Sequence, residues 1–258
     1  MGDIEILRWA DGRFVVDEWC DVNTGDVRVA DSFVISDGAV VGFDRHVERF
    51  SRSVTSIAPD FDAASFRHGL REVIPRLGEW FPRIEALDYG NGLLYRVLNR
   101  PAPVRESTVV VATAVTDPRR FPHTKGPDLQ RLGAMRRETN AAAGEAIILD
   151  NGVIAEGAWS SIVWWEDGVL HRVAGDIPRL DGITESIIVD RARLLGAPVV
   201  DERRTPEQLE GCEVWVLSAL HGIRVVSEWI DGPAMTPEPG RADYWRTLYE
   251  TQRIMLEI

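Results

Sequence analysis

Four glycine turns divide the sequence into short segments and limit the folds that it can adopt. They are Asp11-Gly12, Asp37-Gly38, Asn151-Gly152 and Asp167-Gly168. Pairs of this kind favour the tight turns of β-hairpins, because both turn residues adopt positive φ. Short runs rich in apolar and β-branched residues flank each pair, which is typical of strands. The sequence therefore predicts β-hairpins in both halves of the chain.

Apolar residues at helical spacing predict helices between these strands. The first helix begins with Asp44 as its N-cap and carries Val47, Phe50 and Val54 on one face, so Arg49 lies within it. Further helices are predicted over residues 63–77, 129–143, 183–195 and 242–256. Strands are predicted between residues 4 and 41 and over 83–87, 93–98, 108–115, 145–149, 153–155, 160–165, 169–173, 199–202, 213–217 and 223–227.

These elements predict an α+β protein with two domains. Residues 1–118 form a small N-terminal α/β domain, and residues 125–258 form a larger, β-rich C-terminal domain with helices. Residues 119–124, which show no periodicity, link the two. A chain of 258 residues, 45% of them hydrophobic, is long enough for this arrangement.

The charge and cysteine content narrow the class of ligand. A formal net charge of −12 argues against a nucleic-acid partner and against an anionic membrane surface, and so favours small molecules. Cys20 and Cys212 are far apart in sequence, so no disulfide framework or metal-ligand spacing is expected. We expect a soluble, cytoplasmic protein, because no signal-like or membrane-spanning run is present.

Lys125 is the only lysine among 29 cationic residues; the other 28 are arginine. Arginine can replace lysine as a charge, but it does not readily give up its proton to become an amine nucleophile. Formation of a Schiff base requires such an amine. Lys125 is therefore a candidate catalytic residue, with a chance survivor on a solvated loop as the alternative.

Three features together resemble the class IV aminotransferases. These are Lys125 ahead of a predicted helix, the run from Ala146 to Gly157 that contains Glu156, and Gly182-Ile183-Thr184 at a helix start. This fold-type IV family of pyridoxal-phosphate enzymes includes branched-chain aminotransferase, D-amino acid aminotransferase and aminodeoxychorismate lyase. The resemblance runs from about residue 44 to residue 231. It implies a homodimer with pyridoxal 5'-phosphate between its two domains.

The resemblance also implies roles for these residues. Lys125 would attach the cofactor covalently, and Glu156 would sit against the pyridine nitrogen and keep it protonated. The helix start at Gly182, Ile183 and Thr184 would bind the cofactor phosphate, because a helix N-terminus offers unpaired N–H groups. The alternatives are a loop carboxylate at Glu156 and an ordinary helix cap at Gly182.

Weaker matches add further cofactor contacts. Arg49 matches the arginine of the family's His-x-x-Arg-Leu pattern, which contacts the phosphate. Ser218 and Ala219 match a second phosphate-side loop. Arg131 is a candidate to replace a tyrosine that in many members follows the lysine and bonds the cofactor's ring oxygen.

The substrate side departs more from the family. Arg96 occupies a strand position that in some members binds the substrate carboxylate, with a cross-strand ion pair as the alternative. His221 could line the substrate pocket, although a lone histidine in a loop is more often structural. The family's Gly-Asp-Gly-x-Phe-Glu segment is missing, and residues 30–33 stand in its place.

The function implied is amino transfer between an amino acid and a 2-oxo acid, with Lys125 moving the proton. Two alternatives remain open. Ser218-Ala219-Leu220 is similar to a stretch of the aminodeoxychorismate lyases, which eliminate pyruvate to give 4-aminobenzoate. The other is a cofactor-binding protein without turnover, against which the intact Lys125 and Glu156 argue.

Overall fold

The computed structural model describes residues 4–17, 25–90 and 92–257, and Cys20 lies outside them. The chain divides into two compact units. The first unit comprises Met1–Val104, Thr124–Pro127 and Gln252–Ile258, and the second comprises Arg105–His123 and Asp128–Thr251. The expected boundary after residue 118 thus differs from this division, in which the segment that carries Lys125 belongs to the first unit.

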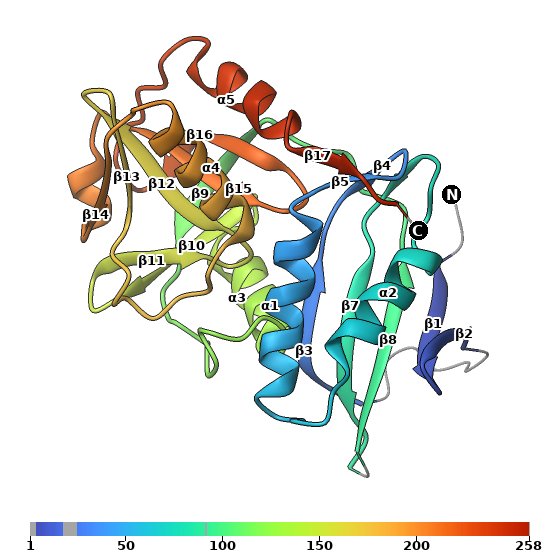
Figure 1. The fold of residues 1–258 in the computed structure, drawn as a ribbon. Coiled ribbons are helices and arrows are strands. Elements are labelled where there is room, and N and C mark those ends of the chain that lie inside the picture. The colour runs from blue at the N-terminus through green and yellow to red at the C-terminus, as the bar shows by residue number, and fades with distance from the viewer. Residues whose placement is uncertain (1–3, 18–24, 91, 258) are drawn as a thin grey trace. The chain divides into compact units, whose positions relative to one another are not determined.

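The first unit contains a five-stranded antiparallel sheet in the order β2-β1-β8-β7-β3. Two helices, α1 (Phe43–Thr55) and α2 (Ala63–Val73), pack on its strands (Figure 1). Their buried faces meet in an aromatic cluster in which Phe50 stacks on Phe66. The strands are β1 (Glu5–Ala10), β2 (Arg13–Val16), β3 (Asp26–Ser32), β7 (Arg83–Asp88) and β8 (Leu93–Asn99).

A second, smaller sheet completes the first unit. Its order is β17-β5-β4-β6, so the last strand of the chain pairs with a strand from the N-terminal region. Leu256, next to this last strand, is buried in the core of the unit. The strands are β4 (Ile35–Ser36), β5 (Ala39–Val41), β6 (Glu79–Trp80) and β17 (Arg253–Met255).

The second unit is built on an eight-stranded mixed sheet in the order β11-β10-β9-β16-β15-β12-β13-β14. Helix α4 (Ile183–Leu194) packs on β12 and β15, α3 (Leu129–Thr139) on β10, and α5 (Arg241–Glu250) on β16. A 3-10 helix spans Pro206–Leu209. The strands are β9 (Thr108–Thr113), β10 (Glu145–Asp150), β11 (Val153–Gly157), β12 (Ser161–Glu166), β13 (Val169–Val173), β14 (Val199–Glu202), β15 (Glu213–Ser218) and β16 (Gly222–Ile230).

All four predicted hairpin turns are confirmed. In each turn both residues have positive φ, from 46° to 50° at the Asp or Asn and from 77° to 83° at the glycine. The turns join β1 to β2, β4 to β5, β10 to β11 and β12 to β13. The local turn chemistry therefore decided these pairings.

Four of the expected helix ends are wrong, and one of them is the end of α3, which lies at Thr139 instead of residue 143. Helix α1 begins at Phe43 with Gly42 as its N-cap, and Asp44 lies in the first turn instead. Helix α2 ends at Val73 because Ile74 precedes a proline and takes an extended conformation, ψ 141°. The C-terminal helix ends at Glu250, and the residues after it form β17.

None of the helices in the described part of the chain is long and apolar enough to cross a membrane.

Candidate functional site

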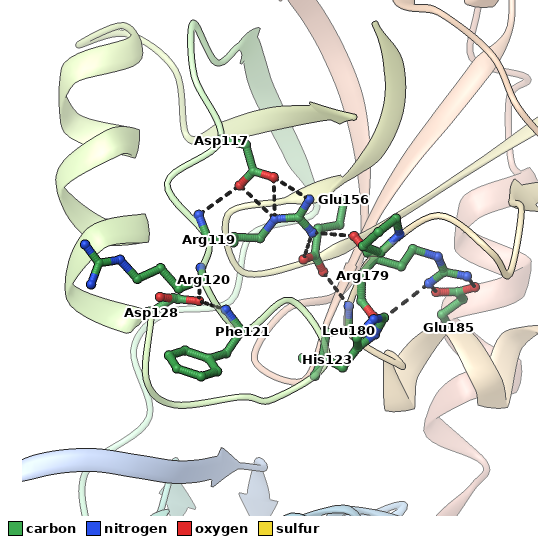
Figure 2. A network of polar contacts seen from close by, with 11 residues as sticks. Asp117, Arg119, Arg120, Phe121, His123, Asp128, Glu156, Arg179, Leu180 and Glu185 are labelled. Carbon is green, nitrogen blue, oxygen red and sulfur yellow. Dashed lines mark hydrogen bonds and ion pairs between the residues drawn. The ribbon is translucent and has the colours of Figure 1, made fainter. Parts of the chain in front are cut away.

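Glu156 lies on β11 with its side chain almost fully buried; the residue is 8% exposed. Oε1 accepts a hydrogen bond from Nη1 of Arg119 at 2.6 Å, and Oε2 accepts one from the backbone N–H of Leu180 at 3.2 Å. One carboxylate thus joins the strand to two loops that are distant in sequence (Figure 2).

The environment of Glu156 changes the pKa of its carboxyl group. Burial raises the pKa of Glu156 to about 7, although the charge and the hydrogen bond of Arg119 lower it. A buried carboxyl that titrates near neutral pH is more typical of a functional site than of a surface ion pair.

Arg119 is the main partner of Glu156, and the sequence did not single it out. Its guanidinium lies between two carboxylates, those of Asp117 and Glu156, with side-chain exposure of only 3%. It also donates to the carbonyl of Pro178 at 2.8 Å. The expected linker is therefore a structured segment that holds a buried carboxylate.

The N-terminus of α4 has no side-chain cap among the described residues. Gly182 is its N-cap, and no side chain of the described residues caps the free amides of the first turn. A Cβ atom at position 182 would overlap the hydroxyl of Ser161, so any residue other than glycine would require that hydroxyl to move. Thr184 is buried in this turn, and its hydroxyl lies 3.4 Å from that of Tyr249. A helix N-terminus with open amides and adjacent hydroxyls is suited to a phosphate.

One loop connects Glu156 to this helix end. Arg179 donates to both carboxylate oxygens of Glu185 in the first turn of α4, at 2.6 Å and 2.9 Å. The next residue, Leu180, donates its N–H to Glu156. The Arg179–Glu185 pair therefore fixes the distance between the buried carboxylate and the open helix end (Figure 2).

Ser218 ends β15 and begins the turn to β16, which also carries Ala219 and His221. The Ser218 hydroxyl accepts a hydrogen bond from the N–H of His221 at 3.3 Å. Nδ1 of His221 in turn accepts the N–H of Glu106 at 3.0 Å. Burial and the charge of Arg224 lower the pKa of His221 to about 4. His221 is therefore neutral at physiological pH, and its Nε2 carries the proton.

Lys125 belongs to the first unit, where its backbone carbonyl accepts the N–H of Ala30 at 2.7 Å. Gly126 follows with φ 134°, and a Cβ there would lie 2.7 Å from the Ala30 nitrogen. Burial lowers the pKa of His46 on α1, and the charge of Lys125 adds to this effect. The Lys125 side chain therefore lies within electrostatic range of α1.

The chain on either side of the lysine segment is held in the second unit. Oδ2 of Asp128 accepts the backbone N–H groups of Arg120 and Phe121, at 2.8 Å and 2.7 Å. His123 Nδ1 lies 3.2 Å from the carbonyl oxygen of Arg179. Hydrogen bonds therefore hold the chain on both sides of Lys125.

Arg49 lies on α1 in a buried network with Asp31 and His46. Two guanidinium nitrogens of Arg49 donate to Asp31 at 2.8 Å, and His46 Nδ1 lies 2.9 Å from the same carboxylate. Burial alone would raise the pKa of Asp31, but the charges and hydrogen bonds of Arg49 and His46 lower it strongly. Asp31 therefore stays ionised and fixes the direction of Arg49.

Comparison with known proteins shows the family of this chain. The model of a family described as amino-transferase class IV matches residues 28–229, well over half of the chain. The chain belongs to the class IV aminotransferases. This confirms the sequence resemblance and identifies the chain as a pyridoxal-phosphate-dependent aminotransferase.

Solved structures of other aminotransferases share the fold at low sequence identity. A branched-chain aminotransferase from Thermoproteus uzoniensis, solved with norvaline, is 20% identical over 96% of this chain and 93% of that chain, with TM-score 0.80. A hypothetical aminotransferase from Mycobacterium tuberculosis in a PLP-bound form is 18% identical over 97% and 98%, with TM-score 0.80. A fold IV-transaminase from Curtobacterium pusillum is 19% identical over 96% and 97%, with TM-score 0.78. These likenesses confirm the expected fold class.

A search of the curated proteins found no match.

Several residues of this class IV aminotransferase fit its cofactor. The second unit holds a buried carboxylate at Glu156 and, one short loop away, the open N-terminus of α4 at Gly182. A pyridine ring that carries a phosphate needs one partner of each kind. Ser161, which the sequence did not indicate, explains why position 182 is glycine.

Two other candidate residues have partners that compete with their expected roles. Arg96 is paired across strands with Glu85 at 2.6 Å, which is the alternative that the sequence left open. Arg131 is 44% exposed and lies 3.9 Å from Asp128, so its described contact is a loose ion pair on the surface.

Proposed function

We propose that this class IV aminotransferase moves an amino group between an amino acid and a 2-oxo acid. Pyridoxal 5'-phosphate, when bound, supplies the electron sink that stabilises negative charge at the substrate Cα. The observation that carries the proposal is the loop from Pro178 to Gly182. It donates a hydrogen bond to the buried Glu156 and then starts the uncapped helix α4.

Each chain residue has a part in this proposal. Lys125 attaches the cofactor and then takes a proton from the substrate Cα and returns it. Glu156 faces the ring nitrogen, while Arg49, Thr184, Ser218 and the amides at Gly182, Ile183 and Ala219 hold the phosphate.

The roles of three further residues stay predictions. Arg131 is the candidate for the ring oxygen, and His221, as a neutral Nε2–H donor, is the candidate for the substrate. The ion pair with Glu85 argues against a free Arg96 as the substrate's carboxylate binder. Homodimer formation and a cytoplasmic location also stay predictions; light scattering at micromolar concentration tests the first.

The test begins with the sole lysine. Borohydride reduction of the protein incubated with pyridoxal phosphate should fix the cofactor to one peptide, the one that contains Lys125. Lys125→Arg keeps the charge but should abolish amino transfer, because a guanidinium neither bonds to the cofactor nor moves the proton. Near-normal turnover of Lys125→Arg would contradict the proposal.

Aminodeoxychorismate lyase activity is the second candidate, because Ser218-Ala219-Leu220 resembles the corresponding stretch of those enzymes. The same protein should be assayed for amino transfer to 2-oxo acids and for pyruvate release from aminodeoxychorismate. Pyruvate release without amino transfer would favour the lyase.

A further inference from the structure

The guanidinium of Arg119 is held between two carboxylates by hydrogen bonds from all three of its nitrogens. Nε donates to both oxygens of Asp117, at 2.9 Å and 3.1 Å, and Nη2 donates to Oδ2 of Asp117 at 2.7 Å. Nη1 donates to Oε1 of Glu156 at 2.6 Å and to the carbonyl of Pro178 at 2.8 Å. A planar fork held in this way has almost no freedom to rotate away from Glu156.

The segment that carries Arg119 is itself preorganised. Asp117 Oδ1 also accepts the backbone N–H of Arg119 at 2.9 Å, which closes a turn around Pro118. The proline ring fixes φ at the middle of this turn. Asp117 is 31% exposed on its side chain, so it anchors the arginine from the solvent side while Glu156 lies inside.

Two arginines of the described residues act on the Glu156 carboxyl through their charge, and each is paired with another carboxylate. Arg119 contacts it directly, and Asp117 lies behind Arg119. Arg179 acts on Glu156 through its charge, and is itself neutralised by Glu185. Burial raises the pKa of Glu156 to about 7, and Arg119 is the largest opposing influence. Arg119 is therefore the main group that favours the ionised form of this buried carboxyl.

We propose that Arg119 is a positioning residue that favours the ionised form of Glu156 and aims it at the cofactor, and so controls amino transfer without touching the substrate. The proposal rests on the function proposed above, in which Glu156 is the partner of the ring nitrogen. A protonated Glu156 would already hold its proton and could not stabilise a pyridinium by charge. Arg119 therefore sets the pH range in which the site works.

The direct test is an NMR titration of Glu156 in the full chain without cofactor. The protein is labelled with [δ-13C]glutamate, and the Glu156 resonance is assigned as the one that Glu156→Gln removes. In wild type it should titrate near pH 7. In Arg119→Met its midpoint should rise by about 1 to 3 pH units, the size of effect that an adjacent arginine has on a carboxylate. Arg119→Lys, which keeps the charge, should restore most of the wild-type value.

A matched variant separates this effect from the general loss of an arginine. Arg204 makes a bidentate pair with Glu166 in the same unit, at 2.6 Å and 3.2 Å. Arg204→Met should leave the Glu156 midpoint unchanged. If Arg119→Met does not fold, Arg119→Lys still tests the proposal. The contact between a lysine ammonium and Glu156 would be longer and looser than that of the guanidinium, so the Glu156 midpoint should rise by about 0.5 pH unit or more.

The loaded enzyme gives a second readout. Arg119→Met should lower kcat by about 10-fold to 100-fold at pH 7, and kcat should recover as the pH rises. KM for the amine should change by less than about threefold. A purely structural role for Arg119 would lower activity equally at every pH.

An unchanged Glu156 midpoint in Arg119→Met would overturn the proposal, whatever the activity. A shifted midpoint in a protein without amino transfer would support the Arg119 contact and contradict the proposed function instead. The two ideas can therefore fail separately.

Discussion

At the residue scale, burial of Glu156 makes stability depend on pH. Its folded pKa, about 7, lies above the ordinary value of 4.5, so between these pH values the folded state binds more protons than the unfolded state. Stability from this group is therefore full below about pH 4.5 and is lost as pH rises through 7. The loss can reach roughly 3 kcal/mol, since one pKa unit corresponds to about 1.4 kcal/mol.

We expect Glu156→Gln to remove this pH dependence. In cofactor-free protein, the free energy of unfolding of the variant minus that of wild type should increase from pH 5 to pH 8. Urea titrations at both pH values measure it, with Glu166→Gln as the control, since the pKa of Glu166 is lowered instead. A constant difference between Glu156→Gln and wild type would mean that Glu156 titrates as an ordinary glutamate.

Residues with local signals could be predicted from the sequence, and residues with distant partners could not. Glu156 and Gly182 stood out because each lies in a short recognisable run. Arg119 did not, because its partner Glu156 is 37 positions away and nothing in the linker is periodic. The Arg96–Glu85 pair depends on strand register, which the sequence left open.

At the element scale, the start of α4 depends on the absence of a side chain at Gly182. Gly182→Ala should weaken cofactor binding by about 10-fold or more, because the new Cβ would overlap the Ser161 hydroxyl and displace the amides of the first turn. Spectroscopic titration with pyridoxal phosphate measures this affinity.

The double variant Ser161→Ala with Gly182→Ala provides the control. Without the hydroxyl, the nearest Ser161 atom to the new Cβ would be its own Cβ at 3.3 Å, which needs only a small adjustment. Much of the lost affinity should return. If the double variant binds no better than Gly182→Ala, the overlap with Ser161 is not the cause.

The C-terminal strand β17 provides a second test at this scale. Leu256→Ala should destabilise the first unit by about 2 to 5 kcal/mol, as large-to-small changes in a core do. Ile254 lies in β17 but is 70% exposed, so Ile254→Ala should have little effect. Hydrogen exchange in β5, the partner of β17, reports the change. Equal effects of the two variants would mean that Leu256 does not serve as a core residue.

The strand β17 also shows where element prediction fails. A helix over residues 242–256 was expected, whereas Arg253–Met255 pair with Val41, Val40 and Ala39. A pairing between strands that are more than 200 positions apart gives no signal in the local sequence. The helix ends at residues 73 and 250 are set by a proline and by this distant strand.

At the scale of the whole molecule, the division into units does not follow the order of the chain. The first unit takes its main part from Met1–Val104 and is completed by Thr124–Pro127 and Gln252–Ile258. We therefore expect the isolated fragment 1–104 to be less stable than the same fragment with residues 252–258 attached through a flexible Gly/Ser linker. Urea midpoints followed by circular dichroism compare them, and equal midpoints would contradict the expectation.

The late position of β17 has a consequence for synthesis of the protein. Strand β5 leaves the ribosome more than 200 residues before its partner β17. At a typical translation rate, the interval is on the order of tens of seconds. During this time β5 has an open edge, of the kind that can pair with other chains. The nascent first unit is thus exposed to aggregation until β17 has been made, and chaperones that bind extended segments would act on it in that interval.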